Sequence, residues 1–292
     1  MGFLNTPRFL LTHPLCAQDR LGTLRRYLAW QIRSRLVDGP VVCGFVNGTR
    51  LAIRRGMTGA TGNVYAGLHE FEDMAFVLHL IREGDRFVDV GANVGSYTVL
   101  AASVGAVCEA FEPGSEAFAA LRVNLSLNNF AQSVRAHQVA IGQRCGTAAF
   151  TANLDTLNHV VSEPSECAVT TVPMVTLDEV LPPGRPTLIK VDVEGYEPEV
   201  VSGAADVLSR EETLSVLMEI NGSASRYGFA EGDLLDRMRE HGFTLCSYDP
   251  FTRTLGASST SRAGNALFVK DREAVQARLR EAPPFRVLGR DI

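Results

Sequence analysis

Hydrophobic positions recur at helical spacing near the N-terminus. Within residues 19–36, a single apolar stripe is formed by Leu21, Leu24, Leu28 and Ile32, at positions i, i+3, i+7 and i+11. The other faces of this predicted helix carry arginines: Arg20, Arg25, Arg26, Arg33 and Arg35. We expect the stripe to pack on the rest of the protein and the arginines to face solvent. The alternative is that a basic amphipathic helix lies on a membrane surface.

A β-hairpin is predicted after this helix. Residues 41–46 and 51–54 are rich in β-forming side chains, and the dipeptide Asn47-Gly48 between them favours a tight turn. Residues 56–67 are rich in Gly and Thr, which predicts a loop. These segments form an N-terminal helical and β-hairpin extension, residues 1–67.

Helical spacing over residues 68–81 leads into strands that alternate with helices, in a second part that spans residues 68–292. Strands are expected over 86–90, 106–111, 133–139, 187–191, 213–220, 243–248 and 266–269. Helices are expected between them over 96–103, 116–127, 198–208 and 232–241. This alternation predicts a Rossmann-like α/β fold with a mostly parallel seven-stranded sheet, covered on both faces. The last strand is expected to be antiparallel, because no helix separates it from the strand before it.

One stretch interrupts the alternation. Between residues 147 and 175 the composition becomes rich in Thr, Ser and Pro, with short β-like pieces at both ends. We interpret this stretch as an inserted hairpin or excursion from the sheet.

Composition narrows the functional class. The 292 residues are 46% hydrophobic and 21% charged, which is ordinary for a soluble globular enzyme. The net charge of −5 disfavours a nucleic-acid binder. No apolar run is long enough for an integral membrane protein, and the N-terminal residues do not resemble a signal peptide. The cysteines are scattered without C-x-x-C spacing, which predicts a reducing, cytoplasmic compartment: Cys16, Cys43, Cys108, Cys145, Cys167 and Cys246.

Candidate chemistry follows the strands. In open α/β sheets, ligands bind beyond the carboxyl ends of the strands. The first strand runs into Gly91 and Gly95, whose lack of a side chain permits a tight turn and close approach to a ligand. Glu112 follows the second strand, 21 residues after Gly91, which is the spacing at which an acid meets ribose hydroxyls.

Five carboxylates are expected along one edge of the sheet. They are Asp89, Glu112, Asp192, Glu194 and Glu219. Each alone has an ordinary structural explanation, such as a helix cap or a solvated loop, but their order after successive strands favours a binding site. Such an edge repels a dinucleotide pyrophosphate and suits S-adenosylmethionine, which carries a sulfonium and an ammonium group. The glycine pattern G-x-x-x-G also differs from the G-x-G-x-x-G of dinucleotide-binding proteins.

Several motifs together resemble the FkbM family of S-adenosylmethionine-dependent methyltransferases. The resemblance covers residues 68–269 and rests on Phe87-Val-Asp-Val-Gly-Ala-Asn-Val-Gly-Ser-Tyr-Thr98, Phe111-Glu-Pro113, Ile189-Lys-Val-Asp-Val-Glu-Gly-Tyr-Glu197 and Asn265-Ala-Leu-Phe-Val269. Ser115 departs from the family pattern, in which a second proline is usual. The resemblance implies a class I methyltransferase fold. It also implies O-methylation of a hydroxyl on a small molecule, often a sugar or a product of bacterial secondary metabolism.

A role can be assigned to each candidate site residue. The methionine end of the donor is expected near Gly91, Asn93 and Gly95, with Asp89 beside the ammonium group. Glu112 is expected at the ribose and Ala140 at the adenine. Weaker assignments are Ser96 and Tyr97 at the donor carboxylate, and Tyr65 and Glu70 closing over the donor.

Direct methyl transfer to a hydroxyl needs positioning and help with the proton. The candidate catalytic residues are Asp192, Glu194 and Glu219, and no residue is assigned to a metal. His69 and His159 are further possible bases, although a lone histidine more often has a structural role.

Three alternatives remain open from the sequence. The chain could be an NAD-dependent oxidoreductase, an N-methyltransferase acting on an amine, or a catalytically silent binding module. A homodimer is a possible assembly, and the acceptor is expected to be a small hydroxylated molecule.

Overall fold

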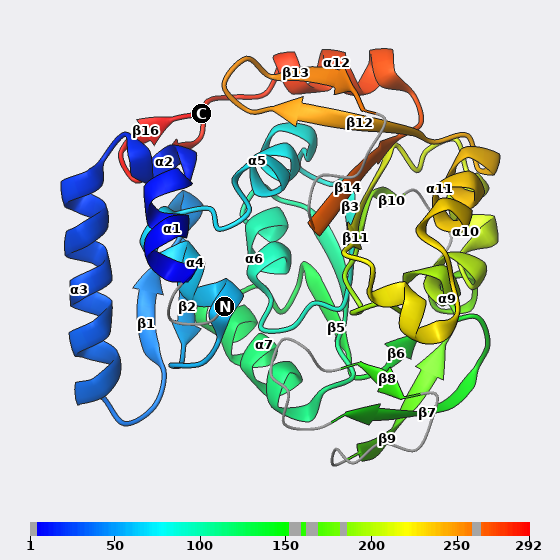
Figure 1. Ribbon diagram of the computed structural model, residues 1–292, viewed down its shortest axis with the longest axis horizontal. Coiled ribbons are helices and arrows are strands. Elements are labelled where there is room, and N and C mark those ends of the chain that lie inside the picture. Colours follow the sequence, from blue (N-terminus) through cyan, green and yellow to red (C-terminus); the bar gives the residue numbers. More distant parts are fainter. Residues whose placement is uncertain (1–4, 152–158, 162–168, 182–185, 259–263) are drawn as a thin grey trace.

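The computed structural model describes residues 5–151, 159–161, 169–181, 186–258 and 264–292. Its centre is a sheet with the strand order β13-β12-β14-β11-β10-β3-β4-β5 (Figure 1). The strands are β3 (Arg86–Val90), β4 (Val107–Phe111), β5 (Val134–His137), β10 (Pro186–Val191), β11 (Ser215–Ile220), β12 (Thr244–Asp249), β13 (Thr254–Ala257) and β14 (Gly264–Val269).

Most of this sheet is parallel, as the alternation of strands and helices predicts. β5, β4, β3, β10 and β11 run parallel, whereas β14 pairs antiparallel with both β11 and β12. The Rossmann-like α/β class and the antiparallel last strand are therefore confirmed. The expected count of seven strands is wrong, because β13 forms a hairpin with β12 and adds an eighth strand at the edge.

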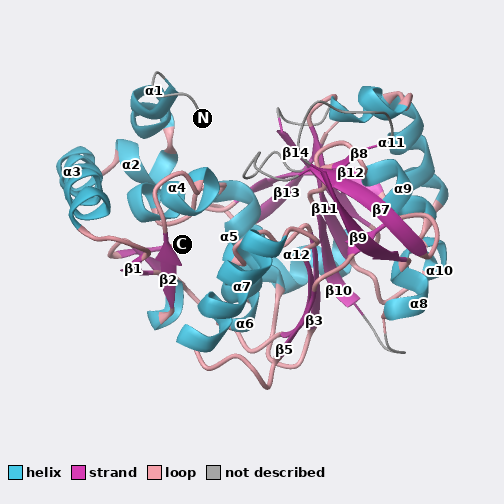
Figure 2. Ribbon diagram, turned by 90° about the horizontal axis from the view of Figure 1, so that it is seen from below, coloured by secondary structure: helices cyan, strands magenta, loops and turns pink. Residues whose placement is uncertain are grey.

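Two hydrophobic layers flank the sheet (Figure 2). On one face lie α5 (Phe71–Leu80), α6 (Ser96–Ala102), α7 (Ser115–Leu127) and α12 (Arg272–Arg280). The other face is covered by α8 (Leu177–Val180), α9 (Glu197–Ser202), α10 (Ala205–Ser209) and α11 (Glu231–Glu240). Successive strand residues alternate between the layers, since Phe87 belongs to the first and Val88 to the second. The single helix expected over 198–208 is two helices, α9 and α10.

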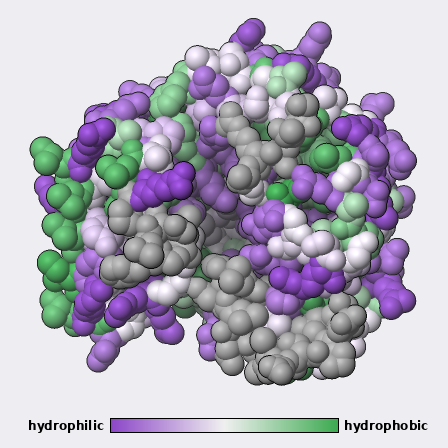
Figure 3. Space-filling view, in the orientation of Figure 1, coloured by the Kyte–Doolittle hydropathy of each residue, from purple (hydrophilic) through white to green (hydrophobic). Residues whose placement is uncertain are grey.

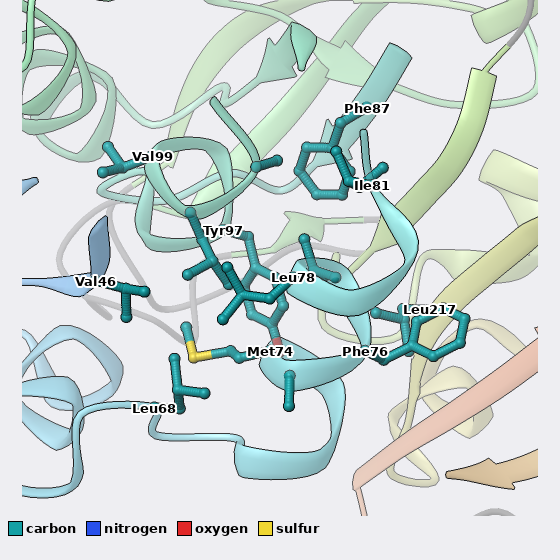
Figure 4. Packing of buried hydrophobic residues seen from close by; sticks show 14 of the residues in the cluster. Val46, Leu68, Met74, Phe76, Leu78, Ile81, Phe87, Tyr97, Val99 and Leu217 are labelled. Atoms are coloured by element: carbon teal, nitrogen blue, oxygen red, sulfur yellow. The ribbon is translucent and has the colours of Figure 1, made fainter. Parts of the chain in front are cut away.

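Helix α5 is the centre of the first layer. Its side chains Met74, Phe76 and Leu78 are at most 1% exposed, and Phe76 lies beside Leu217 of β11 (Figure 4). Tyr97 of α6 and Leu217 of β11 belong to the same cluster. This packing fixes α5 beside the carboxyl ends of the strands, where the predicted chemistry lies.

The predicted excursion from the main sheet is a second sheet. It contains β6 (Ala140–Ile141), β7 (Gly146–Thr151), β8 (Val160–Val161) and β9 (Val169–Val175), in the order β6-β9-β7-β8. A small core of its own includes Phe150, Val172 and Met174. Cys167, which the sequence argument on redox compartment used, lies outside the described residues.

The N-terminal region contains α1 (Asn5–Thr12), α2 (Pro14–Ala17), α3 (Arg20–Leu36), the hairpin β1 (Val41–Gly44) and β2 (Arg50–Ile53), and α4 (Thr58–Ala66). The predicted helix and hairpin are confirmed, with a 3₁₀ turn at Val46–Gly48 between the strands. The loop expected over 56–67 is wrong, because most of it forms α4. Glycine weakens a helix in isolation, but Ala60 and Ala66 are buried and α4 packs against α3, so tertiary contacts outweigh propensity.

Helix α3 is turned the opposite way from the prediction. Its buried side chains are Thr23 and Trp30, and Arg26 donates a 2.9 Å hydrogen bond to the carbonyl of Tyr65 in α4. The stripe of Leu21, Leu24, Leu28 and Ile32 faces outward instead (exposed fractions 84%, 53%, 49% and 58%). Trp30 buries more apolar area than any of the leucines would, and it lies on the face opposite to them.

The C-terminal segment returns to the N-terminal region. After α12, the short strands β15 (Arg286–Val287) and β16 (Arg290–Asp291) form a hairpin beside α2 (Figure 1). Arg290 donates a 2.6 Å hydrogen bond to the carbonyl of Gln18.

Over the described residues, no helix combines the length and apolar composition needed to cross a bilayer.

Candidate active site

A cavity of about 310 Å³ lies at the carboxyl ends of β3, β4, β10 and β11. Most of the predicted site residues line it: Glu70, Asp89, Gly91, Asn93, Ser96, Tyr97, Glu112, Ala140, Asp192, Glu194 and Glu219. The N-terminal region adds Met57 and Ala60 to the wall, and the second sheet adds Phe150 and Val160. The cavity therefore has a polar floor at the strand ends and walls from two other parts of the chain.

Asp89 lies in β3 at the base of the cavity and is 1% exposed. Its Oδ2 accepts a 2.5 Å hydrogen bond from the Thr98 hydroxyl of α6, whereas its buried Oδ1 has no partner among the described groups. Burial raises the pKa of this carboxyl, and the nearby Lys190 opposes the shift. A buried carboxylate oxygen without a donor is suited to a cationic ligand group.

Glu112 follows β4 and joins two loops. Its Oε1 accepts a 2.7 Å hydrogen bond from the Gly114 amide, and its Oε2 accepts one of 2.9 Å from the Asn93 amide. Burial raises its pKa to about 7, although these two hydrogen bonds act in the opposite direction. Each oxygen retains a lone pair, so the carboxylate can still accept from a pair of ligand hydroxyls.

The two glycines of the first loop have different structural roles. Gly91 has a φ of 81°, and a Cβ there would lie 1.8 Å from the carbonyl oxygen of Asp192. Gly95 has a φ of 87° and precedes α6, where a Cβ would lie 2.4 Å from Cδ1 of Leu121. Gly91 therefore lets the first loop approach the loop after β10, whereas Gly95 lets α6 approach α7.

The loop after β10 and the end of β11 bring three carboxylates together. One oxygen each of Asp192, Glu194 and Glu219 lies within 4.8 Å of the others. Glu194 has a left-handed φ of 56°, and Glu197 supports the loop by accepting hydrogen bonds from the amides of Val193 and Gly195, at 3.2 and 3.1 Å. The strand ends and this turn thus place the acids side by side.

Crowding of these carboxylates shifts their proton affinity. Burial and the neighbouring Asp192 raise the pKa of Glu194 to about 7. Burial, Asp192 and Glu194 raise the pKa of Glu219 to about 9. At neutral pH, Glu219 therefore holds a proton and Glu194 exchanges one readily. The same three groups could also hold a metal ion, and they are the one such cluster in the described parts of the chain.

Lys190 supplies a cation inside this acidic site. Its Nζ donates a 2.7 Å hydrogen bond to Asp192 Oδ2 and lies 4.7 Å from the centre of the Tyr97 ring. Burial opposes its charge, but Asp192, Asp89 and Glu70 together raise its pKa above the ordinary value. Lys190 therefore remains charged and neutralises part of the carboxylate cluster.

A second polar network links the N-terminal half to the last strand of the sheet. The Tyr97 hydroxyl donates a 2.7 Å hydrogen bond to Glu70 Oε2. The Asn265 amide of β14 donates to Glu70 Oε1 at 3.0 Å and to Asp73 Oδ2 at 2.7 Å. The single hydroxyl proton of Tyr97 is therefore directed to Glu70, so its expected contact with the donor carboxylate stays a prediction that concerns the N-terminus of α6 and not this hydroxyl.

Tyr65 and the two histidines lie differently from the other candidates. The ring of Tyr65 packs against Tyr27 of α3, and its hydroxyl accepts a 3.2 Å hydrogen bond from Gln31. Tyr65 therefore faces α3, and the expectation that it closes over the donor is corrected. His69 lines the cavity, and burial lowers its pKa. The amide of His159, beside β8, donates to the Thr151 hydroxyl at 2.9 Å.

Sequence reasoning missed several residues of the site. Lys190 received no role, although it stands in a family motif, is one of two lysines in the chain and comes just before the acidic loop. Asn265 stands in a family motif but received no role, and Asp73 carries no local signal, because their contact joins positions 192 residues apart; Asn265 contacts the cavity lining through Glu70. Phe150 and Val160 come from the second sheet, whose position relative to the cavity is not encoded in periodicity.

Distant structural similarities accompany this geometry. The chain is similar to methyltransferase FkbM from Methylobacillus flagellatus KT, with 17% identity and a TM-score of 0.45 over 84% of this chain and 59% of that protein. It is also similar to a TehB-like SAM-dependent methyltransferase from Corynebacterium glutamicum, with 11% identity and a TM-score of 0.43 over 73% and 95% of the two chains. The chain spans about three-fifths of the length of the Methylobacillus protein.

Sequence comparison gives the family. No curated protein matches the chain. The model of the methyltransferase FkbM domain matches residues 89–245, which is more than half of the 292 residues. This match begins at Asp89 on the cavity floor, contains the loop of Glu112 and the three clustered carboxylates, and ends in β12. The chain therefore belongs to the FkbM family of methyltransferases.

Proposed function

We propose that this chain transfers a methyl group from S-adenosylmethionine to a hydroxyl oxygen of a small molecule, such as a sugar or a secondary metabolite. The observation that carries the proposal is the cluster of Asp192, Glu194 and Glu219 in the lining of a cavity that also includes Asp89, whose buried Oδ1 has no hydrogen-bond partner among the described groups. Membership of the FkbM family supports methyl transfer and disfavours the NAD-dependent oxidoreductase considered from the sequence.

The residues present fit the methyl donor. The free oxygen of Asp89 suits an ammonium group, and Glu112 retains acceptors for the two ribose hydroxyls. Gly91, Asn93 and Ser96 line the cavity between these two acids and would hold the methionine part. The adenine would pack near Ala140, Phe111 and Val139.

When bound, S-adenosylmethionine supplies an electrophilic methyl group on its sulfonium. The acceptor hydroxyl must lose its proton as the new bond forms, and Glu194 is the carboxylate best suited to accept it, with its pKa near neutrality. Burial and the neighbouring Asp192 favour the protonated form of Glu219, which would donate a hydrogen bond to Asp192. Lys190 holds Asp192 in place and limits the repulsion among the three acids.

Donor binding is tested by titration calorimetry with S-adenosylmethionine, its demethylated product and NAD. We expect the first two to bind and NAD not to bind. Glu112→Gln should weaken donor binding on the order of 10- to 100-fold, because it loses charge-assisted hydrogen bonds. Glu116→Gln is a matched control on the exposed first turn of α7 and should bind as the unchanged protein does. Binding of NAD alone would refute the proposal.

Catalysis is tested with labelled methyl donor and a panel of sugars, polyketide alcohols and amines. Glu194→Gln should lower kcat about 100-fold and leave donor affinity within about twofold, because a general base contributes that much to rate. Assays with EDTA and with added Mg²⁺ should give equal rates, because the ammonium group of Lys190 already supplies a positive charge at Asp192 Oδ2. Preference for amines would identify an N-methyltransferase. Donor binding without turnover on any acceptor would favour the silent binding module.

We also propose a reducing, cytoplasmic setting for the enzyme. Support comes from the thiols, because every cysteine in the described ranges is free: Cys16, Cys43, Cys108, Cys145 and Cys246. Cys145 is exposed, and persistent exposed thiols are typical of reducing compartments. Thiol titration of protein purified without reductant from the source cell should count free thiols at all of these positions.

A further inference from the structure

The outer face of α3 exposes a continuous row of large apolar side chains. Leu21, Leu24, Leu28, Ile32 and Leu36 all point to solvent, and Leu36 is 78% exposed. Their spacing places them on one face of a helix whose 17 residues are about 25 Å long. Green side chains mark this face at the edge of the molecule in Figure 3, where Figure 1 places α3.

This row differs from the scattered apolar residues that any protein surface contains. Thirteen large hydrophobic residues are exposed in the described parts of the chain, and seven of them lie between Leu21 and Val42. Five of these seven form the row on α3, and the other two, Val37 and Val42, lie after the helix end. A contiguous apolar surface of this kind marks an interaction site. Turning the helix would not bury it, because Trp30 holds the opposite face in the core.

The same face carries concentrated positive charge. Helix α3 contains five arginines and no acidic residue, although the whole chain has a net charge of −5. Arg26 is turned inward to Tyr65 and Asp19. The other four arginines are exposed beside the apolar row: Arg20, Arg25, Arg33 and Arg35.

We propose that this face of α3 binds the surface of an anionic membrane. The leucine and isoleucine side chains would enter the boundary between headgroups and acyl chains, and the arginines would contact lipid phosphates. An anionic surface attracts each arginine near it, whereas neutral lipid does not. Two copies joined through this face would bring eight exposed arginines together without an acid of α3 between them, so the charge favours a lipid partner over a second copy.

The binding is tested by flotation of the full chain with vesicles. One set contains equal parts of phosphatidylcholine and phosphatidylglycerol, and the other contains phosphatidylcholine alone. We expect the unchanged protein to partition on the order of 100-fold more strongly onto the anionic vesicles, and to lose most of this preference when salt is raised to about 0.5 M.

Two variants separate the apolar and electrostatic contributions. Arg25→Gln/Arg33→Gln/Arg35→Gln should lower binding to anionic vesicles on the order of 100-fold. Leu24→Ser/Leu28→Ser/Ile32→Ser should lower it at least 10-fold, because less apolar surface is buried in the lipid. All six side chains are exposed, so neither variant should change the thermal unfolding midpoint.

A matched control alters exposed residues elsewhere. Val107→Ser/Val123→Ser/Arg122→Gln/Arg280→Gln changes β4, α7 and α12, and should bind vesicles within twofold of the unchanged protein. The proposal is overturned if the unchanged protein shows no preference for anionic vesicles, or if the two α3 variants bind as it does. It is also overturned if sedimentation shows a dimer that the leucine variant dissociates while vesicle binding is absent, since the face would then join two copies.

Discussion

The cavity and helix α3 both depart from the usual rule that charged side chains are exposed and apolar side chains are buried, but they do so in opposite directions. At the cavity, charged groups such as Asp89 and Lys190 are buried, and each is stabilised by specific partners. On α3, leucines are exposed while a tryptophan on the opposite face fills the core. A buried charge destabilises the folded state unless it is paired, whereas a few exposed apolar side chains change its stability little. The first region is therefore sensitive to single substitutions, and the second is tolerant of them.

The largest expected effect comes from removing the buried cation. Lys190→Met should lower the free energy of unfolding by about 3–5 kcal/mol, because Asp192 and Asp89 would be left without a counter-charge. Urea unfolding measures this loss. Lys270→Met is the matched control, because the only other lysine in the sequence follows the end of β14 and donates to two backbone carbonyls, of Leu208 and Arg210. Its loss should cost about 1 kcal/mol. Equal losses would show that the acidic site does not depend on its cation.

The next largest effect on stability is expected from two substitutions that compare the two faces of α3. Trp30→Ala should destabilise the protein by about 3 kcal/mol, because it leaves a cavity where a buried aromatic side chain was. Leu28→Ser, two residues earlier but outward, should change stability by less than about 0.5 kcal/mol. A large effect of Leu28→Ser would show that the apolar row is already covered in solution.

The smallest expected effect is a pH dependence of stability. The pKa of Glu219 is raised to about 9 in the folded state, so between pH 6.5 and 8 the unfolded state binds fewer protons and stability falls as pH rises. Burial lowers the pKa of His13 and His79 to about 4 in the folded state, whereas an unfolded histidine has a pKa near 6.5, so these two groups oppose the fall in stability near pH 6.5 and are nearly neutral in both states above pH 7. We expect the thermal midpoint to fall by roughly 4 °C.

Two variants decide whether the acidic cluster causes that slope. Glu219→Gln removes one titrating group and should lower the slope by roughly half, because Glu112 and Glu194, with pKa values of about 7, also lose protons in this window, whereas the exposed Glu116→Gln should leave the slope unchanged. Scanning calorimetry at several pH values measures both. An unchanged slope in Glu219→Gln would show that Glu219 does not contribute to it.

The sheet and the positions of its acids could be predicted from sequence, because both depend on local rules. Alternating strands and helices give a parallel sheet, and the carboxyl ends of parallel strands meet at one edge. Asp89, Glu112 and Asp192 follow directly from this. The contacts of Asn265 with Glu70 and Asp73 could not be predicted, because they form only when distant segments have folded.

The wrong predictions for α3 and α4 also arise because tertiary contacts, and not local sequence rules, decide the outcome. Periodicity shows that α3 is amphipathic, but it does not show which of two apolar faces is buried. The leucine row was the more regular signal, yet Trp30 and the inward hydrogen bond of Arg26 decide the orientation. For α4, glycine content indicated a loop, and packing on α3 produced a helix.

The near contact between Gly91 and Asp192 has a mechanical consequence. The two loops touch backbone to backbone, so neither can shift alone without the other giving way. Even a single methyl group at position 91 would therefore push the loop after β10, which carries Asp192 and Glu194, away from the loop after β3. A ligand that displaces one of these loops would therefore displace the other, so the two sides of the cavity are mechanically coupled.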